Sequence, residues 1–133
     1  MYYFACVKPV LHKIINCLIA AVWLINGLVC KVMNVVPRHE QIVARILGNE
    51  HAMLFTNLIG VAETCMAIWI VWGYKSRLNV WVQILVIAVM NTIEFVSAPD
   101  LLLFGRMNAV LAGLLIAVIG YNRFVLNKET KTA

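Results

Sequence analysis

The stretch NGLVCKVMNVVPRHEQIVARILG, residues 26–48, places Lys31 near the end of an apolar run, followed by a polar cluster at residues 37–40. Proline suits the first position of a helix, where its missing N–H group costs nothing, and Gly48-Asn49 is a typical helix stop. One face of the segment between them is apolar at helical spacing and consists of Ile42, Val43, Ile46 and Leu47. The stretch therefore predicts the end of a long apolar helix and then a short amphipathic helix over residues 38–47, with a solvated loop as the alternative.

The composition of the whole chain is that of a membrane protein. Of its 133 residues, 63% are hydrophobic and 13% are charged, with a mean hydropathy of +0.89, whereas a soluble domain is about half apolar and about a quarter charged. Helices need about 20 apolar residues to cross a bilayer. Four runs of that length are present, at about residues 14–36, 52–72, 78–98 and 101–124. We therefore predict one all-α domain over residues 1–133, an integral membrane four-helix bundle. The amphipathic helix connects helices one and two and is expected to lie in the outer membrane interface.

The basic residues indicate an orientation in the membrane. They form no patch for nucleic acid, so the net charge of +5 does not predict a nucleic-acid partner. Seven would lie on the side of the termini, namely Lys8, Lys13, Lys75, Arg77, Arg123, Lys128 and Lys131. Four would lie on the other side, namely Lys31, Arg38, Arg45 and Arg106. By the positive-inside rule both termini are expected to be cytoplasmic, in the inner membrane if the cell is bacterial.

No self-contained catalytic motif is present, so the catalytic residues stay unknown and the sequence leaves open whether the protein is an enzyme. Four cysteines, Cys6, Cys17, Cys30 and Cys65, form no CxxC pair, and we expect them to be buried as small apolar side chains. His39 and His51 have no carboxylate or histidine at metal-binding helical spacing, so no metal site is predicted.

Small residues recur on the fourth apolar run at intervals of four and comprise Gly105, Ala109, Gly113 and Ala117. Such a ridge permits close approach between helices. Packing within the bundle is the favoured interpretation, and a dimer seam is the alternative, so a homo-oligomer is left open.

Polar side chains recur within the apolar runs, mostly at one depth. Counted from the outer helix ends, Lys31, Glu94, Asn57 and Asn108 lie at roughly 6 to 9 Å, and Glu63 lies at roughly 17 Å, near the midplane. An isolated charge near the centre of a membrane helix costs about 3 kcal/mol. We therefore expect these side chains to face the bundle interior and to be paired.

The expected pairing joins Lys31 and Arg38 to Glu94 and to Glu40, around a pocket open to the outer side. Glu63 has no evident cation at its depth and is expected to be protonated. Asn26 lies about 140° from Lys31 around an α-helix and is not expected in the pocket. The candidate ligand-binding residues are Lys31, Arg38, His39, Glu40, Asn57, Glu63, Asn91, Glu94 and Asn108. They either grip a polar head group or are structural pairs that set helix register.

Several segments together carry a resemblance to a known family. They are WLINGLVCK (23–31), PRHEQIVARILG (37–48), LIGVAETCMAIWI (58–70), Asn91 with Pro99, and NAVLAGLL (108–115), within about residues 14–122. This combination resembles the DoxX-like membrane proteins, and the resemblance implies a four-helix membrane bundle. The family's polar signature would fall on Asn26, Lys31, Pro37, Arg38, His39, Glu40, Glu63, Asn91 and Asn108.

The resemblance implies function only broadly. The wider group is associated with a subunit of a thiosulfate:quinone oxidoreductase, with neighbouring nicotinamide-dependent reductase domains, and with chaperones of receptor assembly. One hypothesis is a membrane component of a redox system that binds a quinone or lipid and serves a redox protein partner. Lys31 and Arg38 would then hold the head group, and Glu63 would exchange a proton. The alternative is a non-enzymatic assembly protein. A small proton-coupled exporter is disfavoured, because helix one carries no acid.

Overall fold

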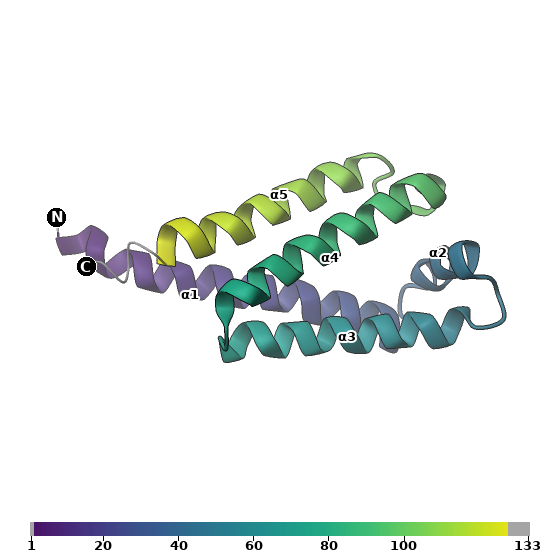
Figure 1. Cartoon of the computed structure of the whole chain (residues 1–133), viewed down its shortest axis with the longest axis horizontal. Coiled ribbons are helices and arrows are strands. Elements are labelled where there is room, and N and C mark those ends of the chain that lie inside the picture. Colours follow the sequence, from purple (N-terminus) through teal and green to yellow (C-terminus); the bar gives the residue numbers. More distant parts are fainter. Residues whose placement is uncertain (1, 128–133) are drawn as a thin grey trace.

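The structure is a computed structural model that describes residues 2–127, with side chains from residue 7 onward. The elements are α1 (Tyr2–Leu24), η1 (Ile25–Val32), α2 (Arg38–Leu47), α3 (Ala52–Trp72), α4 (Ser76–Ser97), η2 (Pro99–Leu101), α5 (Met107–Tyr121) and η3 (Asn122–Leu126) (Figure 1). Both η1 and η3 are π-helices that continue α1 and α5, and η2 is a 3₁₀ turn. No strand occurs between residues 2 and 127, which confirms the all-α prediction.

Four helices are long and apolar enough to span a membrane: Val7–Val32, Ala52–Trp72, Ser76–Ser97 and Met107–Leu126. The second agrees with its predicted bounds, and the third starts two residues early. The first begins at Val7 rather than at residue 14, and it ends at Val32 rather than at residue 36, because Asn34 adopts a left-handed backbone conformation. The fourth begins at Met107 rather than at residue 101, because Pro99 starts a 3₁₀ turn and Gly105 has a positive φ of 54°.

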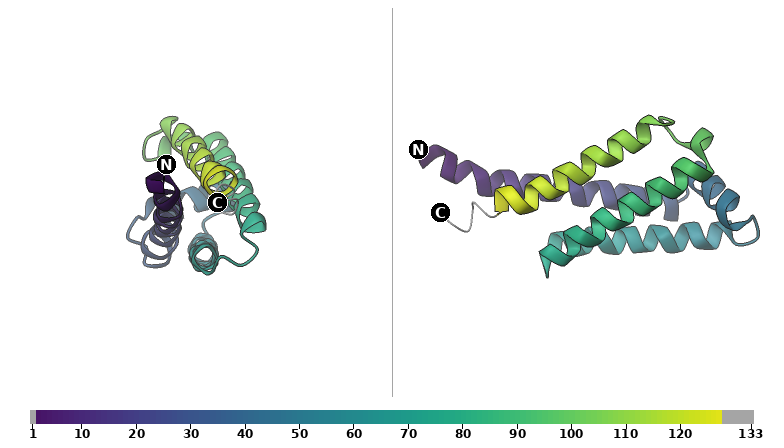
Figure 2. Two further views of the ribbon diagram at one scale, coloured as in Figure 1. Left: turned by 90° about the vertical axis from the view of Figure 1, so that its left-hand side faces the viewer. Right: turned by 45° about the horizontal axis from the view of Figure 1, so that its top comes forward.

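The four long helices form two antiparallel pairs, α1 with α3 and α4 with α5. Both the start of α1 and the end of η3 lie at one end of the molecule, together with the Gly73–Lys75 turn, and α2 lies at the other (Figures 1 and 2). We call these the termini end and the α2 end. Helices α3 and α4 diverge from the short turn that joins them, and α3 packs chiefly on α1 and η1.

Two glycines allow η1 and α3 to cross at close range. A Cβ atom added at Gly27 would lie 2.6 Å from the Gly60 carbonyl oxygen, and one added at Gly60 would lie 2.7 Å from the Gly27 carbonyl oxygen. Because both obstacles are backbone atoms, neither position has room for a side chain. The crossing places the Cβ atom of Glu63 on α3 against Gly27 and the Cβ atom of Lys31 on η1 against Gly60.

The core is small, and the outer surface is apolar. The buried residues of the core are Ile19, Ala20, Trp23, Met66, Ala67, Ile70, Val80, Ile87 and Ile119. Large side chains such as Trp72 and Val96 are more than two thirds exposed, at 78% and 74%. An all-round apolar exterior is what lipid contact requires.

Two expectations about packing are wrong. The small-residue ridge of α5 does not pack inside the bundle, because Ala109, Gly113 and Ala117 are exposed and a Cβ at Gly113 would meet nothing within 4 Å. Cys17 and Cys65 are exposed and Cys30 is half-buried, while the side chain of Cys6 lies outside the described part. In a membrane, lipid solvates small apolar groups as well as a protein core does, so composition does not decide which way they face.

The short amphipathic helix exists at its predicted bounds, Arg38–Leu47. Its apolar face is divided, since Ile42 and Val43 are buried while Ile46 and Leu47 are exposed. An ion pair between the Arg45 guanidinium and the Asp100 carboxylate ties α2 to η2. Helix α2 therefore lies across the end of the bundle and contacts α3, α4 and η1.

Candidate functional site: a polar cavity beneath helix α2

A cavity of about 390 Å³ lies at the α2 end, lined by residues of α1, η1, α2, α3, α4 and α5. Much of its wall is apolar, from Val22, Trp23, Val86, Ile87, Met90, Leu111 and Leu115. Its polar lining residues are Asn26, Lys31, Arg38, His39, Glu63, Asn91, Glu94 and Asn108. Seven of the nine candidate residues are thus brought together around one space.

The buried ion pair of this cavity joins Lys31 to Glu63. The Lys31 Nζ atom donates to both Glu63 carboxylate oxygens at 2.7 Å, and the two side chains are only 5% and 9% exposed. The Gly27–Gly60 crossing allows this contact, because the Lys31 Cβ atom lies against Gly60 and the Glu63 Cβ atom lies against Gly27. Pairing Lys31 with Glu94 and Glu40, and leaving Glu63 without a cation, was therefore wrong.

Asn26 also binds the Glu63 carboxylate, contrary to the expectation that it points elsewhere. Its Nδ2 atom lies 3.2 and 3.3 Å from the two oxygens. The 140° separation from Lys31 assumed an α-helix, whereas Ile25–Val32 is a π-helix. Hydrogen bonds in a π-helix run from residue i to i+5, so residues five apart, such as Asn26 and Lys31, come onto one face.

Two candidate residues lie outside the cavity. Glu40 accepts a hydrogen bond from Asn34 Nδ2 at 3.1 Å, which ties α2 to the end of η1 rather than to a ligand site. Asn57 is half-buried on α3 and is not part of the cavity wall. Asn57 was selected by its depth in the membrane and Glu40 as a partner for Lys31 and Arg38, and neither criterion determines which residues face the cavity.

Arg38 and Glu94 face the cavity without a partner. Both side chains are half-buried, and no residue between 7 and 127 forms a hydrogen bond or ion pair with either. Glu94 lies within electrostatic range of Lys31 and Glu63. Two cations and two carboxylates thus surround the cavity, but only one of each is used in a protein contact.

His39 lies beside these charges on α2. Burial, together with the positive charges of Lys31 and Arg38, lowers the pKa of His39 from 6.5 to about 4. The imidazole is therefore neutral at neutral pH and can donate or accept a hydrogen bond at the cavity wall.

The amides of Asn91 and Asn108 join the second helix pair at the cavity. Asn108 Nδ2 donates to Asn91 Oδ1 at 3.3 Å, which links α5 to α4. Asn91 Nδ2 donates to the Ile87 carbonyl at 2.9 Å. The side-chain Oδ1 atom of Asn108 accepts no hydrogen bond from residues 7–127, so it stays available to a ligand.

A second polar cluster, not predicted from the sequence, lies at the termini end. Gln83 accepts a hydrogen bond from Trp23 Nε1 at 2.9 Å and donates to Asn79 Oδ1 at 2.6 Å. His12 pairs with Asn122 at 2.9 Å. Asn79 and Gln83, four residues apart within an apolar run, were the available signal, because amides inside a membrane helix need partners.

Four spanning helices that enclose a polar cavity define an integral membrane protein of the helix-bundle class. More specifically, the model of the DoxX-like family matches residues 20–121, most of the chain. The chain therefore belongs to the DoxX-like family. No curated protein and no solved structure matches it significantly.

Proposed function

We propose that the cavity at the α2 end binds the polar head of a membrane amphiphile, a quinone in preference to a phospholipid. The proposal rests on Arg38 and Glu94, two charged side chains of opposite sign that line the same cavity without a partner among residues 7–127. Glu94 lies in a spanning helix, where an ionisable group without a partner is costly, and a ligand that contacts both groups removes that cost.

A quinone head fits the chemistry of this wall. It carries two ring oxygens, each of which accepts a hydrogen bond as a carbonyl and donates one as a hydroxyl in the reduced form. Arg38 only donates, and an ionised Glu94 only accepts, so the reduced quinol satisfies both: one hydroxyl oxygen accepts from Arg38, and the other hydroxyl donates to Glu94. The volume of about 390 Å³ falls in the range of small-molecule sites, and the apolar wall suits the start of an isoprenoid tail.

The roles of the other residues follow from their contacts. Lys31 and Glu63 neutralise each other and are assigned to positioning the wall rather than to gripping the head. His39 and Asn108 complete the polar side of the site. In a redox system this chain would be the membrane component that holds the amphiphile, while a redox protein partner supplies the electrons.

Equilibrium binding of a short-tailed quinone, kept in its reduced quinol form, to the purified protein in detergent tests this proposal. Arg38→Gln and Glu94→Gln should each weaken binding at least tenfold, which is about 1.4 kcal/mol. The matched controls are Arg106→Gln and Glu40→Gln, at the same end but outside the cavity wall, and they should bind like the wild type. Equal affinity of all five proteins, or preference for phosphatidylcholine over the quinone, would rule out the quinone site.

A second candidate is a non-enzymatic assembly protein, and one observation favours it. The exposed ridge of Ala109, Gly113 and Ala117 on α5 has the small-residue spacing of membrane helix contacts. Affinity purification from crosslinked membranes would then recover one dominant membrane partner, and Gly113→Leu would lose it while quinone binding stays unchanged.

A further inference from the structure

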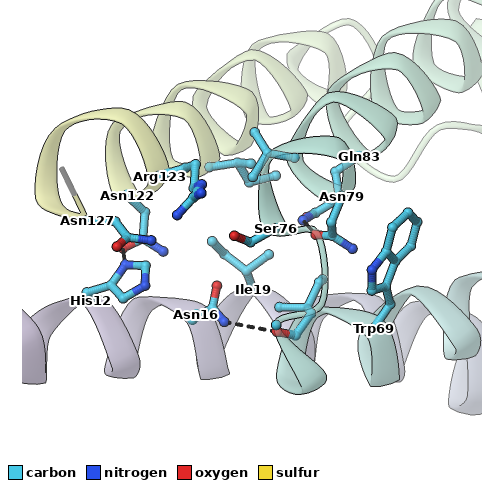
Figure 3. A pocket seen from close by; sticks show the side chains of 14 residues that line it. His12, Asn16, Ile19, Trp69, Ser76, Asn79, Gln83, Asn122, Arg123 and Asn127 are labelled. Atoms are coloured by element: carbon cyan, nitrogen blue, oxygen red, sulfur yellow. Dashed lines mark hydrogen bonds between the residues drawn. The ribbon is translucent and has the colours of Figure 1, made fainter. Parts of the chain in front are cut away.

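A second cavity, of about 170 Å³, lies at the termini end between α1, the end of α3, the start of α4 and the end of α5 with η3 (Figure 3). Unlike the first cavity, its wall contains no aspartate or glutamate among residues 7–127. It does contain Arg123, Ser76 and Asn122. Figure 3 shows the Arg123 guanidinium and the Ser76 hydroxyl facing the same space.

The start of α4 adds a positive electrostatic contribution to this space. Ser76 is the first residue of a 22-residue helix, and no side chain caps that end. The first backbone N–H groups of a helix have no partner inside the helix, and together with the helix dipole they favour an anion.

An independent observation points to a ligand in this space. Asn122 is only 2% exposed and lines the cavity. Its Oδ1 atom, which can only accept, takes a hydrogen bond from His12 Nδ1 at 2.9 Å. No hydrogen bond among residues 7–127 uses the Nδ2 group, and this atom is not sealed inside the protein, so a donor is left for a group that enters the cavity.

The depth of the cavity is that of lipid phosphates. Trp72, Tyr74, Trp81 and Tyr121 are each more than half exposed at the same end, and exposed Trp and Tyr mark the membrane interface. By the positive-inside rule this end faces the cytoplasm, where the leaflet carries anionic lipids.

We infer that the termini-end cavity binds a phosphate group, that of an anionic phospholipid in the adjacent leaflet. Arg123 supplies the charge, while Asn122, Ser76 and the start of α4 supply hydrogen bonds. The volume of about 170 Å³ holds the phosphate and leaves the acyl chains outside the bundle. This site is independent of the proposed quinone site, which lies at the opposite end.

Thermal unfolding in detergent with added lipid tests the inference. Phosphatidylglycerol should raise the melting temperature of the wild type, and phosphatidylcholine should not. Arg123→Gln should lose this rise, whereas Lys13→Gln, which removes an exposed charge at the same end outside the cavity, should keep it. Inorganic phosphate added without lipid distinguishes a lipid phosphate from a free anion. If it raises the melting temperature as much as phosphatidylglycerol does, the site binds free phosphate.

Asn122→Asp provides a second variant should Arg123→Gln fail to fold. Aspartate has nearly the shape of asparagine and still accepts from His12, but it places a negative charge in the cavity. The rise with phosphatidylglycerol should therefore disappear. A rise that persists in either variant, or that phosphatidylcholine produces equally, would overturn the phosphate site.

Discussion

At the scale of single residues, the Glu63 carboxylate determines how the α2 end is built. It accepts hydrogen bonds from Lys31 and Asn26, and its side chain is almost completely buried. A buried ion pair adds little net stability compared with apolar residues of the same size, but removing one partner leaves an uncompensated charge. The pair therefore acts chiefly to specify how η1 sits against α3.

Glu63→Gln should lower the free energy of unfolding in detergent by about 3 kcal/mol, because it leaves the Lys31 ammonium without a counter-ion. The double variant Lys31→Met with Glu63→Met should recover most of this loss, since neither charge is then buried. Glu40→Gln serves as the control and should have little effect. If the double variant loses as much stability as Lys31→Met and Glu63→Met lose in sum, the two residues do not act as a pair.

Protonation of His39 should weaken the fold as the pH falls. The pKa of His39 is about 4 in the folded chain and 6.5 when it is unperturbed, so the unfolded chain binds the proton more tightly. The stability that neutral His39 provides is complete above pH 6.5 and is lost progressively toward pH 4. As the pH falls through this range, the melting temperature should fall less steeply for His39→Gln than for the wild type. Parallel curves would show that His39 is not the group whose protonation weakens the fold.

At the scale of elements, the π-helix η1 and its crossing with α3 set the geometry of the cavity. The i to i+5 pattern of η1 puts Asn26 and Lys31 on one face, and the two glycines let that face reach Glu63. Helix α2 then covers the same end, attached through Ile42, Val43 and the Arg45–Asp100 pair. The cavity is thus a consequence of how three elements meet rather than of any one of them.

Adding one methyl group at the crossing should separate η1 from α3. Gly27→Ala and Gly60→Ala place a Cβ within 2.7 Å of a backbone oxygen, and overpacking of this kind costs about 1–3 kcal/mol. Gly113→Ala is the matched control, because its Cβ would meet nothing within 4 Å, and alanine favours a helix by about 1 kcal/mol over glycine. Thermal unfolding should show losses for the first two and no loss for the third, and equal melting temperatures would exclude the close crossing.

At the scale of the whole molecule, two helix pairs meet near the termini and diverge toward α2 (Figure 1). The divergence opens the cavity of about 390 Å³, while the smaller cavity of about 170 Å³ lies where the pairs converge. The two cavities therefore occupy opposite ends of the bundle and would face opposite sides of a membrane.

Site-directed labelling should place the two ends on opposite sides of the membrane, with the termini in the cytoplasm. In a variant whose native cysteines are replaced, Gln41→Cys on α2 should react with a membrane-impermeant maleimide in intact cells. Lys75→Cys in the Gly73–Lys75 turn should react only after the membrane is permeabilised. Both positions are exposed, so access is set by the bilayer alone, and the reverse pattern would invert the orientation predicted from the loop charges.

The sequence by itself determined the number of spanning helices, the helix Arg38–Leu47 and the family, because these depend on local hydropathy, helix-terminating residues and short motifs. It also selected most of the residues around the larger cavity, since charged groups in lipid must face inward. The tertiary structure alone decided that Lys31 pairs with Glu63, that Asn26 joins them, that Glu40 and Asn57 stay outside, and that a second cavity exists. These outcomes depend on the local winding of a π-helix and on which helices approach one another, and neither can be read from the order of residues along a single apolar run.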